Sequence, residues 1–70
     1  MAYTVHKYDA NSDGKPTHWL CCVKTQHWVE DAKEASVFED KELANILAHD
    51  WTEFYVSKGY PYRCAVGERV

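Results

Sequence analysis

Long apolar runs are absent from the sequence, and glycine, proline and cysteine are scarce. No stretch approaches the roughly 18 to 20 apolar residues that a membrane-spanning helix needs. With three Gly and two Pro among 70 residues, no flexible linker divides the chain. Three cysteines, of which Cys21 and Cys22 are adjacent, do not fit the paired framework of a small secreted protein. We therefore expect one compact domain over residues 1–70, without a membrane segment, in a reducing cytoplasm.

Positive charge is also in short supply, because eight Lys and Arg stand against eleven Asp and Glu. The imbalance is concentrated between Glu30 and Glu53, where eight acids face two bases, Lys33 and Lys41, and 8 − 2 leaves a net charge of −6. An acidic field of this kind attracts basic protein surfaces and repels nucleic-acid phosphates. The charge therefore favours a protein partner with a basic surface and disfavours direct nucleic-acid binding.

The pattern of apolar residues predicts strands at both ends of the chain and one helix between them. Alternation typical of strands occurs at residues 2–8, 17–24, 27–29 and 60–66. A helix is predicted from Lys41 to about Lys58, with Asp40 as its N-cap and Gly59 as its left-handed end. These elements predict an α+β domain, an antiparallel sheet of three or four strands with one α-helix packed on one face.

Strand alternation also predicts which side chains the helix covers. We expect the covered face to carry Tyr3, Val5, Trp19, Cys21 and Val23, and the opposite face to carry His6, Tyr8, His18, Leu20 and Cys22. The apolar stripe of the helix is predicted to consist of Leu43, Ile46, Leu47, Trp51, Phe54 and Tyr55. Asp50 falls inside this stripe. It is either a structural acid bonded to Arg63, a tyrosine hydroxyl or an indole N–H, or part of a binding surface.

The segment THWLCCVKTQHW, residues 17–28, contains two His-Trp pairs and two cysteines and raises the question of a metal site. Residues four apart on a strand, such as His18 and Cys22, lie about 13 Å from each other, too far to share one ion. A reactive thiolate needs a helix N-terminus or a cationic pocket, which a strand cysteine lacks. We therefore expect no metal, no cofactor and no catalytic residues, and hence no enzyme.

Two surfaces are candidates for binding a partner. The first is acidic and is predicted to contain Glu34, Glu39, Asp40, Glu42, Asp50 and Glu53. The second is the uncovered sheet face, where Tyr8, His18 and Leu20 provide a second contact or a homodimer interface. As an alternative function, this aromatic face would stack nucleic-acid bases, but a pI near 5.7 gives no basic footprint for such binding.

The segment HWVEDAKEASVFEDKELANILAHDW, residues 27–51, has an aromatic-Val strand, an Asp, an Ala and a Phe before a capped helix with a charged first turn. This pattern covers about a third of the chain and resembles small phage and prophage proteins. The size, acidity and strand-strand-helix-strand order are similar to those of several anti-CRISPR proteins. The resemblance implies an inhibitor in the cytoplasm of a bacterial host cell, which blocks a nucleic-acid-handling complex. It carries over no site residues.

Overall fold

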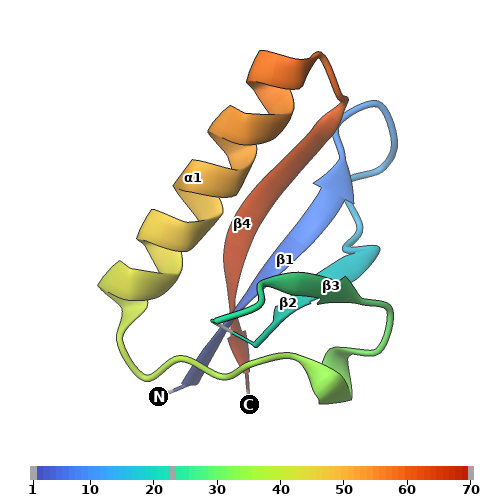
Figure 1. The fold of residues 1–70 in the computed structure, drawn as a ribbon. Coiled ribbons are helices and arrows are strands. Elements are labelled where there is room, and N and C mark those ends of the chain that lie inside the picture. Colours follow the sequence, from blue (N-terminus) through green and yellow to red (C-terminus); the bar gives the residue numbers. More distant parts are fainter. Residues whose placement is uncertain (1, 23, 70) are drawn as a thin grey trace.

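The computed structural model describes residues 2–22 and 24–69 and has an α+β fold, as the sequence predicts. In chain order its elements are β1 (Ala2–Asp9), β2 (His18–Cys21), β3 (His27–Val29), the 3₁₀-helix η1 (Ala32–Glu34), α1 (Lys41–Lys58) and β4 (Tyr62–Arg69). The strands form one antiparallel sheet in the order β3-β2-β1-β4, and α1 packs against one face of it (Figure 1). No helix in the described part of the chain is long and apolar enough to cross a membrane.

Helix α1 begins and ends where its local sequence predicts. The Asp40 carboxylate accepts a hydrogen bond from the backbone N–H of Glu42 at 2.9 Å, which satisfies a donor left free at the first turn. At the other end Gly59 has φ 80° and ψ 15°, a left-handed conformation that glycine adopts without steric cost. Both signals are local, and the predicted bounds of the helix are confirmed.

The register between β1 and β2 places Leu20, and not Trp19, under the helix. His6 pairs with Trp19 and Lys7 pairs with His18, so Leu20 shares a face with Val5. The predicted placement of Trp19 and Cys21 on the covered face is wrong, because a shift of one residue exchanges the two faces of a strand. Val23, predicted to share that face, lies outside the described residues.

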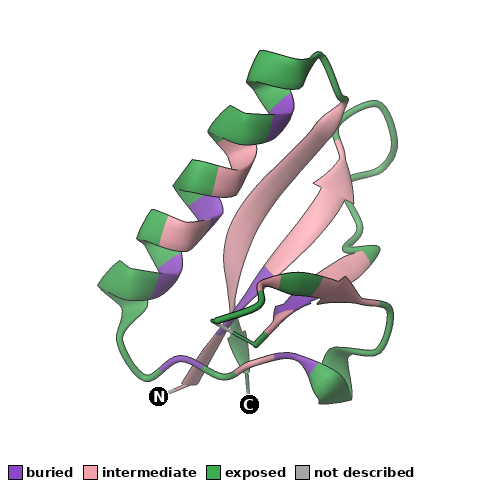
Figure 2. Ribbon diagram, in the orientation of Figure 1, coloured by how far each residue is buried: buried purple, intermediate pink, exposed green. Residues whose placement is uncertain are grey.

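The core lies between the sheet and α1, where Val5, Leu20, Phe38, Ala44 and Ala48 form one buried cluster. Along α1 the buried positions follow the side that faces the sheet (Figure 2). The buried side of α1 therefore contains two alanines, whose small side chains allow the helix to approach the sheet closely.

The predicted apolar stripe of α1 is consequently wrong for three of its six residues. Leu43, Ile46 and Phe54 are 41%, 56% and 45% exposed, whereas Tyr55 is buried. Leu47 and Trp51 are partly buried against the core. The helix thus buries a face rotated toward its alanines and leaves large apolar side chains in solvent.

The loop before α1 closes one end of the core. The backbone N–H groups and carbonyls of Tyr3 and Phe38 exchange two hydrogen bonds of 2.8 Å, so this loop continues the sheet beside β1. The Ser36 N–H donates to the Leu20 carbonyl at 3.0 Å, and the Ser36 hydroxyl accepts from the Cys22 N–H at 2.7 Å. These bonds fix the end of β2, where the cysteines lie.

Candidate functional site

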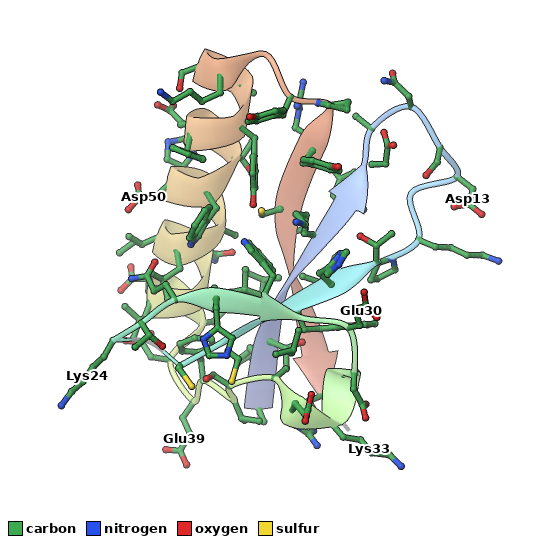
Figure 3. The ribbon with its side chains drawn as sticks, turned by 45° about the vertical axis from the view of Figure 1, so that its right-hand side comes forward. Asp13, Lys24, Glu30, Lys33, Glu39 and Asp50 are labelled. Atoms are coloured by element: carbon green, nitrogen blue, oxygen red, sulfur yellow. The ribbon has the colours of Figure 1, made fainter. Side chains whose placement is uncertain are left out.

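The solvent-facing side of α1 carries a row of apolar side chains interrupted by one acid. We call Leu43, Ile46, Asp50 and Phe54 the exposed row. At about 100° per residue these four positions fall within roughly 80° of one another around the helix axis. All four are exposed, and Asp50 points away from the sheet (Figure 3). An exposed apolar row with a carboxylate in its middle is typical of a contact surface.

A hollow of about 210 Å³ opens beside Asp50. It is lined by Gln26, Asp50, Trp51 and Phe54. The Trp51 indole N–H donates a hydrogen bond to the Gln26 side-chain oxygen at 3.1 Å, which holds the turn before β3 against the helix. The rings of Trp51 and Phe54 meet edge to face, with centroids 5.6 Å apart. Aromatic walls beside a carboxylate suit a cationic side chain, and arginine above all.

Asp50 has none of the structural partners considered from the sequence. It is exposed, and no hydrogen bond or ion pair is seen for it among the described residues. The Trp51 indole is bonded to Gln26, and Arg63 Nη1 donates to the carbonyls of Tyr60 and Tyr62 at 3.3 and 2.8 Å. The prediction of a satisfied structural acid is therefore wrong, and the binding-surface hypothesis stays a prediction.

The other predicted acids are exposed but divide into separate groups. Glu42 and Glu53 are eleven residues apart on α1, which places them within about 20° of each other on a helix. Asp50 lies about 80° away from Glu42 by the same geometry. Glu39 and the N-cap Asp40 precede the helix, and Glu34 belongs to η1. The predicted acids therefore do not form one continuous surface.

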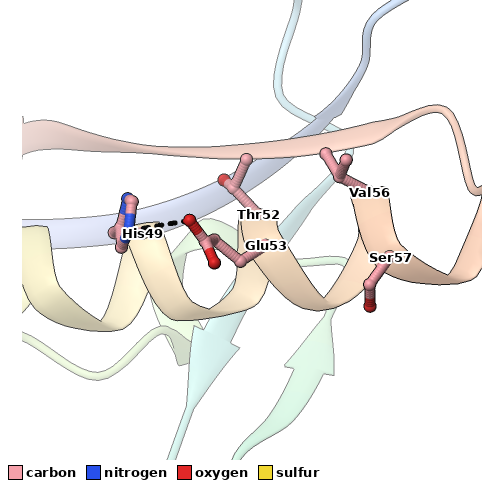
Figure 4. Close-up of a pocket in the computed structure, with 5 residues that line it drawn as sticks. All are labelled: His49, Thr52, Glu53, Val56 and Ser57. Carbon is pink, nitrogen blue, oxygen red and sulfur yellow. Dashed lines mark ion pairs between the residues drawn. The ribbon is translucent and has the colours of Figure 1, made fainter.

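A second hollow, of about 360 Å³, lies on the Glu53 side of α1 (Figure 4). It is lined by His49, Thr52, Glu53, Val56 and Ser57. His49 Nε2 lies 3.2 Å from Glu53 Oε1, one helical turn away, and both side chains are mostly exposed. Because such an exposed pair contributes little, this hollow offers a weaker anchor than the one beside Asp50.

The structure does not bring together Tyr8, His18 and Leu20, the residues of the predicted second contact. Tyr8 lies on the uncovered sheet face, but His18 pairs with Lys7 on the opposite face. Leu20 is completely buried in the core. The prediction is wrong for Leu20 because the register of β1 and β2, which alternation alone does not fix, turns that side chain toward α1.

Lys7 is enclosed by aromatic rings on the helix side of the sheet. Its Nζ lies 4.8 Å from the ring centroid of Tyr62, 5.1 Å from that of Trp28 and 5.5 Å from that of Tyr55. Burial lowers the pKa of Lys7, against an opposing effect of its neighbour Cys64. Three ring faces around one ammonium group give cation–π stabilisation, so this lysine supports the fold.

Cys64 makes the stability of the protein sensitive to alkaline pH. Burial raises the pKa of its thiol to about 11 from an ordinary value near 9, against the opposing effects of Thr52 and Lys7. The unfolded chain therefore loses this proton first. The stabilisation is complete below about pH 9 and is lost as the pH rises to about 11.

Between pH 8 and 10.5 the wild-type chain should lose stability as this contribution disappears, and Cys64→Ala should lose about 1 kcal/mol less over the same range. The figure is reduced for the partial exposure of the thiol. Urea denaturation under reducing conditions measures it. The lowered pKa of Lys7 acts in the opposite direction, so the comparison is made between variants at each pH. The exposed Cys22, replaced in the same way, is the control; an equal change in Cys22→Ala would contradict the assignment to Cys64.

Three potential metal ligands meet at the end of β2. The Sγ atoms of Cys21 and Cys22 and a ring nitrogen of His27 all lie within 4.8 Å of one another, the one such group among the described residues. All three cysteines are free thiols. A hydrogen bond with Cys22 raises the pKa of Cys21, and Glu34 adds to the effect. Sequence reasoning missed this group because it compared residues along one strand and not across two.

No protein-family model, curated protein or solved structure matches the chain.

Proposed function

We propose that the chain is a non-enzymatic protein-binding module, a phage-type inhibitor similar to anti-CRISPR proteins. It places the exposed row of α1 against a basic surface of a nucleic-acid-handling host complex. The observation that carries the proposal is the hollow beside Asp50, where an exposed carboxylate stands among aromatic and aliphatic side chains that α1 leaves in solvent.

The apolar part of the exposed row provides the binding energy. Leu43, Ile46 and Phe54 each retain about half of their exposure, so a partner that covers them gains about 1 kcal/mol for each side chain. Their spacing along one helix matches the way in which an amphipathic helix is received in a groove. These residues lie outside the buried cluster, so their exposed apolar surface is available to a partner.

The charge provides the choice of partner. A basic side chain that enters the hollow would pair with Asp50 and stack on Trp51 and Phe54. Glu42 and Glu53 lie outside this hollow and are exposed, so they act as rim charges that steer association and raise its sensitivity to salt. The proposed contact therefore has an apolar centre, one central ion pair and an acidic rim.

Charge reversal at Asp50 tests the centre of this surface. We expect Asp50→Lys to weaken binding at least about 30-fold, because it would bring two cations together inside the contact. The partner is first captured from bacterial host lysate with the wild-type chain and identified by mass spectrometry. Its dissociation constant is then measured by calorimetry for each variant.

Glu53→Lys and Glu42→Lys are the matched controls, since each changes the net charge by the same amount at the rim. We expect them to weaken binding less than tenfold at physiological salt, mainly through slower association. Equal losses in all three variants would show that only net charge matters. An unchanged affinity of Asp50→Lys would refute the placement of the contact.

The alternative is nucleic-acid binding or homodimerisation through the uncovered sheet face. One observation favours it: a hollow of about 320 Å³ on this face is lined in part by Trp19, Lys33 and Arg69. A stacked base needs an aromatic ring beside cations of this kind. Retention of the chain on single-stranded DNA at low salt, with loss in Trp19→Ala, would favour this alternative over the helix surface.

A further inference from the structure

The cluster of Cys21, Cys22 and His27 has a geometry that the proposed contact on α1 does not use. The two sulfur atoms are 3.2 Å apart, and a ring nitrogen of His27 completes a group whose members all lie within 4.8 Å of one another. Cys22 and His27 are exposed and Cys21 is partly exposed, so an ion can reach the cluster from solvent. Two thiols and one imidazole are the ligands that zinc prefers in proteins.

Two features of the backbone bring these side chains together. Cys21 lies directly opposite His27 in the β2–β3 pairing, which places their side chains next to each other on the same face. Cys22 follows with φ 61°, so it leaves the alternation of the strand and its sulfur meets that of Cys21. The Ser36 hydroxyl, bonded to the Cys22 N–H at 2.7 Å, holds this unusual conformation.

We propose that Cys21, Cys22 and His27 bind one zinc ion through two thiolates and one imidazole, with water as the fourth ligand. Zinc–sulfur bonds of about 2.3 Å and zinc–nitrogen bonds of about 2.0 Å place tetrahedral ligand atoms roughly 3.5 to 3.8 Å apart. The sulfurs therefore separate by about half an ångström on binding. Two S–H bonds break, two Zn–S bonds form, and two protons pass to the solvent.

A neighbouring hydroxyl group supports the imidazole ligand. Thr25 Oγ1 lies 3.2 Å from His27 Nδ1, and a hydrogen bond between them would hold the ring in one orientation beside the two sulfurs.

Zinc would also fix the turn between β2 and β3. The Cys22 carbonyl accepts a hydrogen bond from the Gln26 N–H at 2.5 Å, so the ligands stand on both sides of this turn. Gln26 in turn lines the hollow beside Asp50. A metal that holds Cys22 and His27 would thus hold one wall of that hollow, and small domains commonly need a stabilising element of this kind.

The test is titration of the purified, reduced full chain with Co²⁺ and then Zn²⁺ without oxygen. We expect one equivalent of Co²⁺ to give the absorption of a tetrahedral thiolate complex, which Zn²⁺ then displaces. Cys22→Ser and His27→Asn should each raise the dissociation constant for Zn²⁺. For Cys22→Ser we expect an increase of at least about 100-fold, because loss of a ligand should weaken binding more than loss of a group that only supports a ligand. Zn²⁺ should also raise the melting temperature of the wild-type chain.

Cys64→Ser and His49→Asn are the matched controls, because they remove a thiol and an imidazole outside the cluster. Circular dichroism checks that each variant is folded. We expect His27→Asn to keep the fold, because His27 is exposed. No thiolate absorption, an affinity unchanged in His27→Asn, or an equal loss in Cys64→Ser would overturn the proposal. Formation of a Cys21–Cys22 disulfide with no uptake of metal after reduction would overturn it too. None of these outcomes depends on the protein partner.

Discussion

Replacing Leu20 with alanine is expected to lower the free energy of unfolding by about 3 kcal/mol. The side chain is completely buried, and it packs in the core cluster with Val5, Phe38, Ala44 and Ala48. Its removal loses apolar burial and leaves a cavity that the short strand β2 cannot close. A domain of this length has a total stability of only about 4 to 10 kcal/mol, so this loss would remove from roughly a third to three quarters of it. Urea denaturation followed by tryptophan fluorescence measures the loss.

Leu43→Ala is the matched control, since it removes the same atoms from the exposed row. Leu43 is 41% exposed, and we expect its replacement to cost less than about 1 kcal/mol. The faces predicted from the sequence imply the reverse order of the two stability losses, because they place Leu43 against the sheet and Leu20 in solvent. Equal or reversed losses would therefore show that the structure has the wrong face of β2 or of α1 in the core.

The elements of this fold are predictable because their signals are local. Asp40 and Gly59 mark the ends of α1 by their own side chain and backbone, and the apolar and aromatic residues of β1 alternate in the usual way. The α+β class follows from the order of these elements. None of these inferences requires knowledge of which segments meet in space.

The faces are harder to predict because both sides of β2 and several sides of α1 are apolar. On β2, Trp19 and Leu20 alternate, and the choice depends on a register with β1 that only the tertiary structure fixes. On α1, the large apolar residues suggest one stripe, but close packing on the sheet favours the side with Ala44 and Ala48. Tertiary packing determines which face of β2 and which side of α1 are buried, and therefore which side chains stay exposed.

The candidate sites show the same division. The exposure of the acids was predictable from composition, whereas the hollow beside Asp50 depends on Gln26, which arrives from the distant β2–β3 turn. The cluster of Cys21, Cys22 and His27 depends on a cross-strand pair and on one left-handed residue. A pair of cysteines five and six residues before a histidine, around a tight turn, is the sequence signal that points to such a cluster.

Tyr55→Ala is expected to cost about 3 to 4 kcal/mol, the other large effect of a single substitution. Tyr55 is buried, and its ring centroid lies 5.4 Å from that of Tyr62, 5.5 Å from Phe54, 5.7 Å from Trp51 and 6.2 Å from Tyr60. The alanine variant loses this aromatic packing and the apolar burial together. Urea denaturation measures the loss of stability.

The same substitution separates the fold from the proposed contact, because Trp51 and Phe54 both pack on Tyr55 and also form the walls of the hollow. Tyr55→Phe keeps the ring, so it should stay within about 1 kcal/mol of the wild type and bind the partner normally. Tyr60→Ala, at a residue that is 52% exposed, should cost little stability and leave binding unchanged. In Tyr55→Ala, binding measured well below the melting temperature should still weaken, since the walls lose their support. Full affinity in that folded variant would show that the walls do not receive the partner.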